Sequence, residues 1–317
     1  MPRLFCFGLG YTALALARRL KQDGWTVAGT CRREEKRKAL ADNGIEAFLF
    51  DDGRPLADPS AALAGTTHLL SSISPGRSTD GEADCVDPVL AAHDNDISAI
   101  EPPLQWVGYL STTSVYGDRD GAWTDESAPL AATSARGRRR IAAEQAWLDW
   151  GRETGVPVHC FRLAGIYGPG RSAIDQLRRG SARRIDKPGQ VFNRIHVEDI
   201  ATIVQASMNR PRAGGVYNCA DDDPAPSHEV VAHAAELLGV DPPPLVPFDQ
   251  AELSPMGRSF YAENKRTDNG LIKRELAVRL AHPTYREGLA AQLACEKGSG
   301  NGPASPPSRS GPSPSTP

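Results

Sequence analysis

The first twenty residues change from a short apolar run to a segment of helical periodicity. Leu4 to Phe7 is continuously apolar, which is typical of a strand buried on both faces of a parallel sheet. Apolar residues then recur at three- to four-residue spacing through Leu14, Ala17 and Leu20, which predicts a helix with one buried face. The two patterns meet at Gly8-Leu-Gly10, so we expect a glycine turn between strand and helix.

The same alternation continues along the chain and predicts an α/β fold. We expect further strands at residues 25–29, 46–50, 68–73, 105–110, 156–163 and 216–219. We expect helices at residues 88–100, from residue 197 onward, and at residues 227–238 with Ser227 as the cap. Strands that alternate with helices form parallel sheets with helices on both faces, so we predict a doubly wound parallel sheet.

The glycine turn carries the spacing Gly-x-Gly-x-x-Ala at Gly8, Gly10 and Ala13. Gly8 allows a tight turn, Gly10 lets a pyrophosphate approach the backbone, and Ala13 lets the helix lie close to the strand. The helix that follows begins at Tyr11, and its free N–H groups would face the phosphates. We therefore predict that Gly8, Gly10, Tyr11 and Ala13 belong to a dinucleotide site. An ordinary tight turn between a strand and a helix is the alternative.

The residues that select between NAD and NADP are expected about twenty residues beyond the glycines. An Asp or Glu there would bind the ribose 2′-hydroxyl of NAD, but this chain has Arg32 and Arg33. Guanidinium groups suit a 2′-phosphate, so we predict NADP(H) in preference to NAD(H). The alternative is that both arginines lie at a solvated helix start and pair with Glu34 and Glu35.

Two more strand ends supply polar residues at the same predicted edge. Asp51 follows the strand at 46–50 and is able to accept a hydrogen bond from an adenine amino group, although an Asp in a turn is equally common. Ser72 lies at the end of the strand at 68–73, where it would face the cofactor across the sheet. We include both in the candidate cofactor site.

Composition and charge exclude several other classes of protein. The net charge of −3 argues against a nucleic-acid binder, and no apolar run reaches the ~18 residues of a membrane span. The six cysteines and seven histidines are scattered without metal-ligand spacing, which predicts reduced thiols and no metal site. The first strand begins too early to leave room for a signal peptide, so we expect a cytoplasmic protein.

Several motifs in order resemble one known family. They are Ser111-Thr-Thr-Ser-Val-Tyr-Gly117, Asp125-Glu126, Ala142-Ala-Glu-Gln145, Arg162-Leu-Ala-Gly-Ile-Tyr-Gly-Pro-Gly170, Asn193-Arg-Ile-His-Val-Glu-Asp199 and Gly215-Val-Tyr-Asn218. The set resembles the extended and atypical short-chain dehydrogenase/reductases, which include sugar-nucleotide epimerases and dehydratases. It covers residues 3 to 290.

This resemblance implies a Rossmann-type fold and a candidate catalytic set. In that family a Ser/Thr at the end of the fifth strand lies beside the nicotinamide and orients the substrate hydroxyl. By motif position this residue resembles Thr112, with Ser111 as its neighbour. Tyr116 is a candidate proton source, reached directly or through water. His196 is a second candidate proton donor, with a structural hydrogen bond at a helix start as the alternative.

The chain departs from the family at the Tyr-x-x-x-Lys motif. Arg136 stands at the Tyr position and Arg140 at the Lys position, and no nearby Tyr or Lys is able to replace them. Arg140 could still contact ribose or phosphate as a fixed cation. Arg136 cannot act as an acid or base, because guanidinium does not lose its proton in proteins. The usual proton relay is therefore missing.

Together these observations predict a Rossmann-type domain at residues 1–165, a smaller substrate lobe at 166–296 that is partly interleaved with the sheet, and a disordered tail at 297–317. The leading interpretation is an NAD(P)-dependent oxidoreductase or epimerase-like enzyme acting on a small polar or sugar-like molecule, with a homodimer as a candidate assembly. The alternative is a non-catalytic NADP(H)-binding regulator, which would keep the glycine turn without the Tyr/Lys pair.

Overall fold

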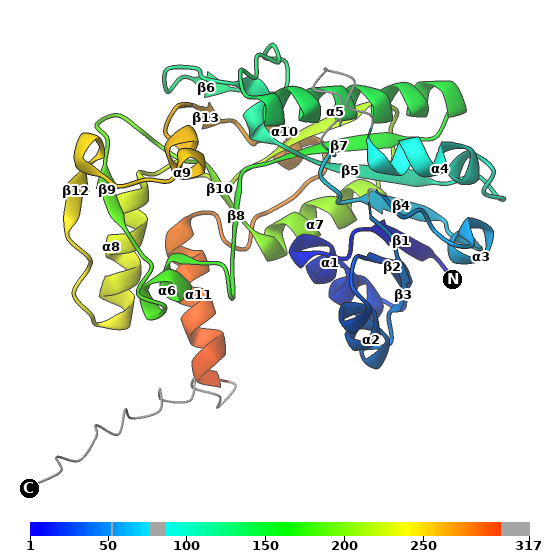
Figure 1. The fold of residues 1–317 in the computed structure, drawn as a ribbon, viewed down its shortest axis with the longest axis horizontal. Helices are drawn as coiled ribbons and strands as arrows, with labels where there is room; N and C mark the ends of the chain where they lie inside the picture. Colours follow the sequence, from blue (N-terminus) through cyan, green and yellow to red (C-terminus); the bar gives the residue numbers. More distant parts are fainter. Residues whose placement is uncertain (52, 77–86, 299–317) are drawn as a thin grey trace, which may run out of the picture.

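The computed structural model describes residues 1–51, 53–76 and 87–298, so nearly all of the expected tail lies outside the described part. Its centre is a seven-stranded parallel sheet in the order β11-β7-β5-β4-β1-β2-β3 (Figure 1). The strands are β1 (Arg3–Phe7), β2 (Thr26–Cys31), β3 (Glu46–Leu49), β4 (His68–Ser71), β5 (Trp106–Thr112), β7 (Val158–Leu163) and β11 (Gly215–Cys219). This sheet confirms the predicted α/β fold class.

Helices cover both faces of the sheet because the strands bury side chains on both sides. In β1, Leu4 and Cys6 enter one core and Phe5 and Phe7 enter the other, as the two-residue period of a strand requires. The first core is covered by α1 (Tyr11–Gln22), α2 (Glu34–Asp42), α7 (Val197–Met208) and α10 (Gly270–Glu275). The second is covered by α3 (Pro59–Leu63), α4 (Pro88–Ser98) and α5 (Ala135–Thr154).

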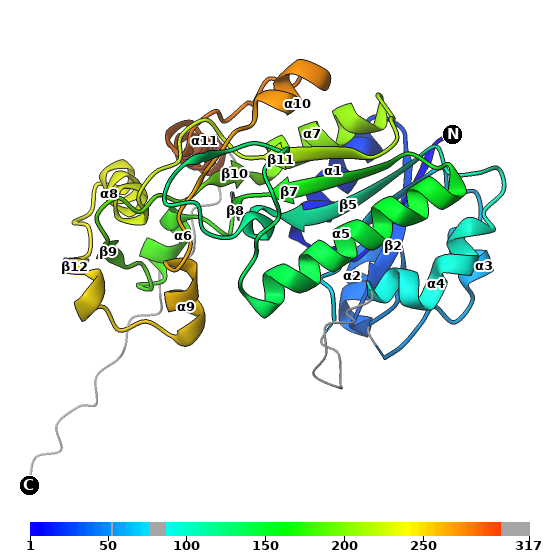
Figure 2. The same cartoon turned by 90° about the horizontal axis from the view of Figure 1, so that it is seen from above.

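A smaller lobe lies beside the sheet (Figures 1 and 2). It contains two clusters of buried apolar side chains. One cluster joins α6 (Ala173–Arg178), α8 (Ser227–Leu238) and α11 (Tyr285–Gly298). A second joins β9 (Arg184–Asp186), β12 (Leu245–Pro247), η2 (Phe248–Gln250) and the segment around α9 (Pro255–Phe260). The short strand pairs in the described residues are β9 with β12, β8 (Gly165–Tyr167) with β10 (Arg194–His196), and β6 (Trp123–Thr124) with β13 (Arg266–Thr267).

The chain returns to the sheet after it has begun the lobe. Strand β11 pairs in parallel with β7, and α7 packs against α1, although both come from beyond residue 165. The start of α8 differs from the prediction: Pro226 occupies the N-cap position, and no side chain caps the helix there, so the capping role expected for Ser227 is wrong. No helix in the described residues is long and apolar enough to cross a membrane.

Candidate functional site

The glycine turn after β1 is held in place by the neighbouring strand β2. Gly8 has φ +89°, and an ideal Cβ on it would lie 2.9 Å from Cγ1 of Ile73, so glycine is required on both counts. The Gly8 N–H donates to Oγ1 of Thr30 at 2.8 Å. Gly10 is the N-cap of α1, and Ala13 is fully buried where α1 meets the sheet. The turn therefore presents the start of α1 at the C-terminal edge of the sheet.

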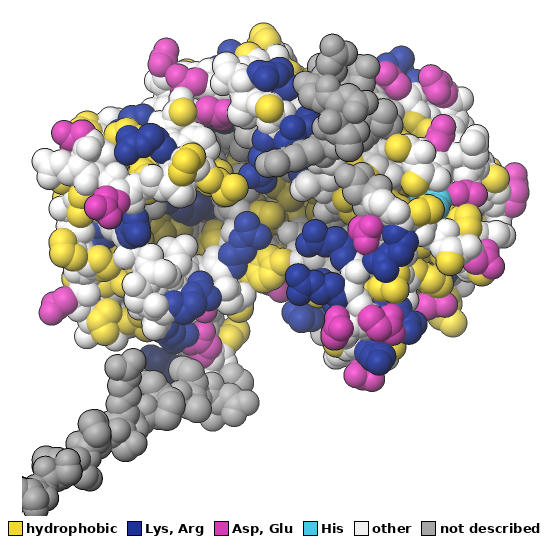
Figure 3. Space-filling model, in the orientation of Figure 1, with side chains coloured by type: hydrophobic (Ala, Val, Ile, Leu, Met, Phe, Trp, Pro, Cys, Tyr) yellow, Lys and Arg dark blue, Asp and Glu magenta, His cyan; other side chains and the backbone are white. Residues whose placement is uncertain are grey.

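A cleft of about 990 Å³ opens directly in front of this turn. Six of the predicted cofactor residues line it, namely Gly8, Gly10, Arg32, Arg33, Asp51 and Ser72. Ser74, which the sequence places beside Ser72 at the end of the same predicted strand, also lines it, and lining residues that the sequence did not single out for this site include Lys36, Phe50 and Ile73. Lys36 could have been predicted to line the cleft, because it lies one helical turn after Arg33 in the sequence. Figure 3 shows Lys and Arg side chains along the hollow between the two parts of the molecule.

Two arginines that line the cleft are exposed on its surface. Arg32 and Arg33 are exposed, and their guanidinium groups form no hydrogen bond or ion pair with the residues that the structure describes. Glu34, one of their expected partners, pairs with Arg37 at 2.6 Å. Glu34 therefore does not form the pairing expected at an ordinary helix start, and Arg32 and Arg33 both line the cleft.

Asp51 and Ser72 lie at the expected strand ends. The Asp51 carboxylate accepts from the Gly53 N–H at 3.2 Å and from Arg54 at 2.8 Å, which matches a turn residue. It also lines the cleft, so contact with an adenine amino group stays a prediction. Ser72 lines the cleft from the loop after β4, where its backbone N–H donates to the carbonyl of Phe7 at 2.9 Å.

Arg140, at the position expected for the family's lysine, is buried behind the cleft. Its Nη1 donates to Oη of Tyr109 at 2.8 Å and to the carbonyl of Leu110 at 3.0 Å, while Nη2 donates to Oγ of Ser74 at 3.1 Å. Ser74 lines the cleft, so one side chain separates the guanidinium from that space. Arg136, one turn earlier on α5, is exposed to solvent.

Of the predicted catalytic residues, Thr112 retains a free donor. It lies half-buried at the end of β5, and its Oγ1 accepts from the Ser114 N–H at 3.3 Å, which leaves the hydroxyl hydrogen available. Ser111 is buried, and its hydroxyl donates to the Glu144 carboxylate. Because that donor is already used inside the protein, Ser111 lies in the supporting structure behind Thr112.

The position of Tyr116 corrects its expected role as a proton source. The side chain is fully buried, and its hydroxyl donates to Oδ1 of Asn218 at 2.7 Å and accepts from Arg162 at 2.8 Å. Burial raises the pKa of the phenol to about 12. A phenol closed into this network does not reach a molecule in the cleft, so Tyr116 serves to hold β7, β11 and the segment after β5 together.

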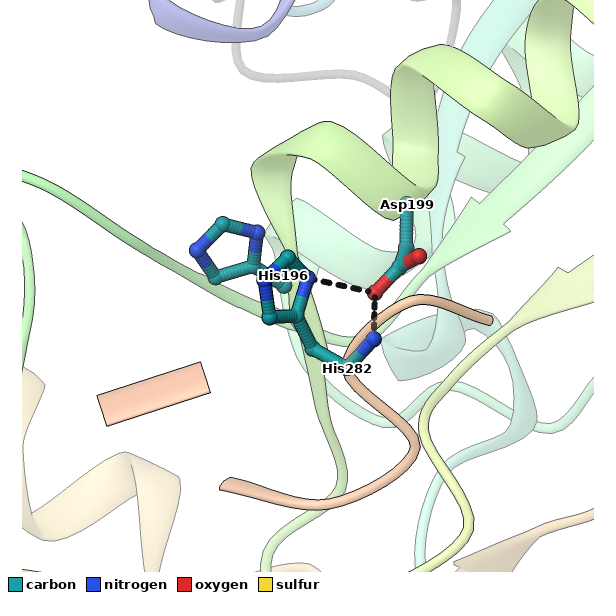
Figure 4. A group of neighbouring side chains, drawn as sticks. All are labelled: His196, Asp199 and His282. Atoms are coloured by element: carbon teal, nitrogen blue, oxygen red, sulfur yellow. Dashed lines mark hydrogen bonds and ion pairs between the residues drawn. The ribbon is translucent and has the colours of Figure 1, made fainter. Parts of the chain in front are cut away.

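His196 lies in a group of three side chains with Asp199 and His282 (Figure 4). The carboxylate of Asp199 accepts from the backbone N–H groups of Ala281 and His282 at 2.7 and 3.0 Å, and from Nδ1 of His282 at 3.1 Å. Nδ1 of His196 accepts from the Glu198 N–H at 3.3 Å, which caps α7. Burial lowers the pKa of His196 to about 4.

This geometry favours the structural alternative for His196. A neutral ring whose Nδ1 accepts a backbone N–H carries its proton on Nε2, so neither nitrogen offers a lone pair to a metal ion. The Asp199 carboxylate is likewise occupied by three donors from the segment at Ala281 and His282. The trio fastens that segment to the start of α7.

The fold and the cleft define a Rossmann-type nucleotide-binding protein. The model of the NAD dependent epimerase/dehydratase family matches residues 8–220, and the chain belongs to this family. This result confirms the resemblance that the ordered motifs indicated. Protein YeeZ of Escherichia coli K12 is 29% identical over 247 residues, which cover 77% of this chain and 86% of YeeZ.

Two solved structures extend the comparison over nearly the whole chain. A functionally unknown conserved protein from Silicibacter pomeroyi DSS is 51% identical, with a TM-score of 0.83 and coverage of 93% of this chain and 99% of that one. MoeE5, solved in complex with UDP-glucose and NAD, is 20% identical, with a TM-score of 0.76 and coverage of 95% and 100%. The likeness to MoeE5 shows a shared fold alone.

Proposed function

We propose that this protein binds NADP(H) in the cleft and transfers hydride to or from a small polar or sugar-like substrate. The observation that carries the proposal is the cleft of about 990 Å³, which runs from the glycine turn to Arg32 and Arg33. The family is one of nicotinamide-dependent enzymes, and MoeE5 holds both NAD and UDP-glucose in its structure. A sugar nucleotide is therefore the first substrate class to test.

Each part of the cleft suits one part of the cofactor. The N-terminus of α1 has no acidic residue in its first turn, so its N–H groups are suited to a pyrophosphate. Arg32 and Arg33 would hold a 2′-phosphate, and Ser74 with Arg140 behind it would hold a ribose. When bound, the nicotinamide would supply the hydride in its reduced form or accept it in its oxidised form. The Thr112 hydroxyl would donate to the substrate oxygen on which negative charge develops.

Replacing Arg32 and Arg33 together by Ala is expected to weaken NADPH binding by about 1.5–3 kcal/mol, the range for hydrogen bonds to charged groups. NADH binding should scarcely change, because NADH has no 2′-phosphate. Fluorescence titration of both cofactors measures the two affinities. Arg37→Ala is the matched control, since Arg37 lies in the first turns of α2, just beyond these two residues, and pairs with Glu34. Equal losses for NADPH and NADH, or a wild type that prefers NADH, would contradict the assignment.

A second candidate function is a non-catalytic NADP(H)-binding regulator. The observation that favours it is the replacement of the Tyr/Lys pair by an exposed Arg136 and a buried Arg140. Tyr116 is the expected substitute for the missing tyrosine, but its hydroxyl is hydrogen-bonded to Asn218 and Arg162 inside the protein. A regulator would bind NADPH tightly and oxidise none of it with any aldehyde, ketone or sugar nucleotide.

Thr112→Ala separates the two functions. For an enzyme, the change should lower kcat by about 10–100-fold and leave NADPH affinity nearly constant, because one transition-state hydrogen bond is lost far from the phosphates. Thr112→Ser keeps the hydroxyl and should retain most of the rate. NADPH oxidation is followed at fixed cofactor over a panel of aldehydes, ketones and sugar nucleotides. Turnover that survives Thr112→Ala in full would remove Thr112 from the active site.

A further inference from the structure

The loop after β8 lies directly against the start of α1. Gly168 has φ +145°, and an ideal Cβ on it would lie 2.8 Å from Oη of Tyr11 and 2.9 Å from Cγ1 of Val197. The Tyr11 hydroxyl donates to the carbonyl of Pro169 at 3.0 Å. Since Tyr11 is the first residue of α1, these contacts bring the segment from Gly168 onward beside the glycine turn.

Arg171 comes two residues after Pro169, and its charged side chain lies near the start of α1. Its side chain is exposed, and Cζ lies 6.0 Å from the centroid of the Tyr11 ring. Burial raises the pKa of Tyr11, the Arg171 charge opposes this, and the Asp175 and Glu198 charges add to it. Neither carboxylate forms an ion pair with Arg171 in the described part of the chain. Asp175 instead accepts from the Ser172 hydroxyl at 2.7 Å.

Two positive features therefore meet here, and neither forms an ion pair with a carboxylate in the described part of the chain. The N-terminus of α1 carries the positive end of the helix dipole and has no acidic residue in its first turn. Arg171 adds a full positive charge from an element far away in the sequence. An anion between them would be attracted by both, and a guanidinium is suited to bind two phosphate oxygens at once.

We propose that Arg171 binds the pyrophosphate of the dinucleotide from the side opposite the glycine turn. This inference rests on the proposed function, because it needs a dinucleotide in the cleft. The pyrophosphate is the relevant group because Tyr11 adjoins Gly10, whereas Arg32 and Arg33 follow the C-terminal end of β2, where we place the 2′-phosphate. Arg171 comes from the chain beyond β8, so the contact couples the smaller lobe to the bound cofactor.

The test compares Arg171→Ala and Arg171→Lys with Arg179→Ala, a control at another exposed arginine just after α6. Affinities are measured by calorimetry for NADPH, for ADP-ribose, and for adenosine 2′-monophosphate, which has no pyrophosphate. Arg171→Ala should weaken NADPH and ADP-ribose by about 10-fold each and leave adenosine 2′-monophosphate unchanged, since a charge-assisted hydrogen bond is lost. Arg171→Lys should lose less, and Arg179→Ala should bind like the wild type.

The outcomes distinguish the two proposals. A wild type that binds neither NADPH nor ADP-ribose overturns the proposed function together with this inference. A wild type that binds both, with Arg171→Ala unchanged, overturns the role of Arg171 alone. A loss for adenosine 2′-monophosphate equal to that for NADPH also overturns it, because the effect would then not concern the pyrophosphate. Equal melting temperatures for the three variants show that the comparison is between folded proteins.

Discussion

Gly10→Val should abolish measurable dinucleotide binding, an expected loss of at least about 100-fold in affinity, or about 2.8 kcal/mol. The folded protein has room for the side chain: the nearest atom to an ideal Cβ on Gly10 is the Gly8 carbonyl oxygen, at 3.9 Å. The backbone at Gly10 has φ −85°, which any residue adopts. The valine would therefore occupy space in front of α1 that a pyrophosphate needs.

The measurement is a fluorescence titration with NADPH, accompanied by thermal unfolding. Valine is a poor N-cap, so a cost of about 1 kcal/mol in stability is expected alongside the loss of binding. Gly10→Ala provides a graded control, because a single methyl group should weaken binding less than valine does. Gly10→Val with wild-type affinity would show that the dinucleotide does not bind at this turn.

Glu144→Ala should lower the free energy of unfolding by about 3–5 kcal/mol, the range for breaking a buried ion pair. The Glu144 and Arg162 side chains are 2% and 6% exposed, and Oε2 lies 2.9 Å from Nη2. Ser111 also donates to this carboxylate, and Arg162 donates to Tyr116. Removal of the carboxylate leaves Arg162 as a buried cation without its counter-charge.

Urea unfolding at neutral pH measures the effect. Asp149→Ala on the same helix is the matched control, because Asp149 pairs with Arg152 at an exposed position. Exposed pairs contribute about 0–1 kcal/mol, so the control should unfold nearly as the wild type does. Similar losses in both variants would mean that burial of the Glu144–Arg162 pair does not determine its importance.

Most of the cleft that we propose for the cofactor could be predicted because its sequence signals are local. Gly8, Gly10, Arg32 and Ser72 each stand at or just after the end of a predicted strand. Parallel strands place their C-terminal ends at one edge of the sheet, so residues at those ends meet once the strands pair. The structure accordingly places all four along one cleft, together with Arg33 and Asp51.

The catalytic half was less predictable because its partners are distant in the sequence. Motif position places Tyr116 just after β5, yet the phenol turns inward to Asn218, 102 residues further on. That partner arrives only because β11 pairs with β7. In the same way, Arg171 reaches Tyr11 only because the chain beyond β8 folds back over α1.

The sequence by itself determined the strand–turn–helix order, the parallel sheet and the residues at its C-terminal edge. The hydrophobic period and the glycine spacing extend over only a few residues, so they can be recognised without knowing which other segments pack against them. The tertiary structure decided which polar groups form hydrogen bonds inside the protein and which remain available to bind a ligand. A hydroxyl such as that of Ser111 or Tyr116 donates to whichever acceptor packing brings near, and no local pattern specifies that acceptor.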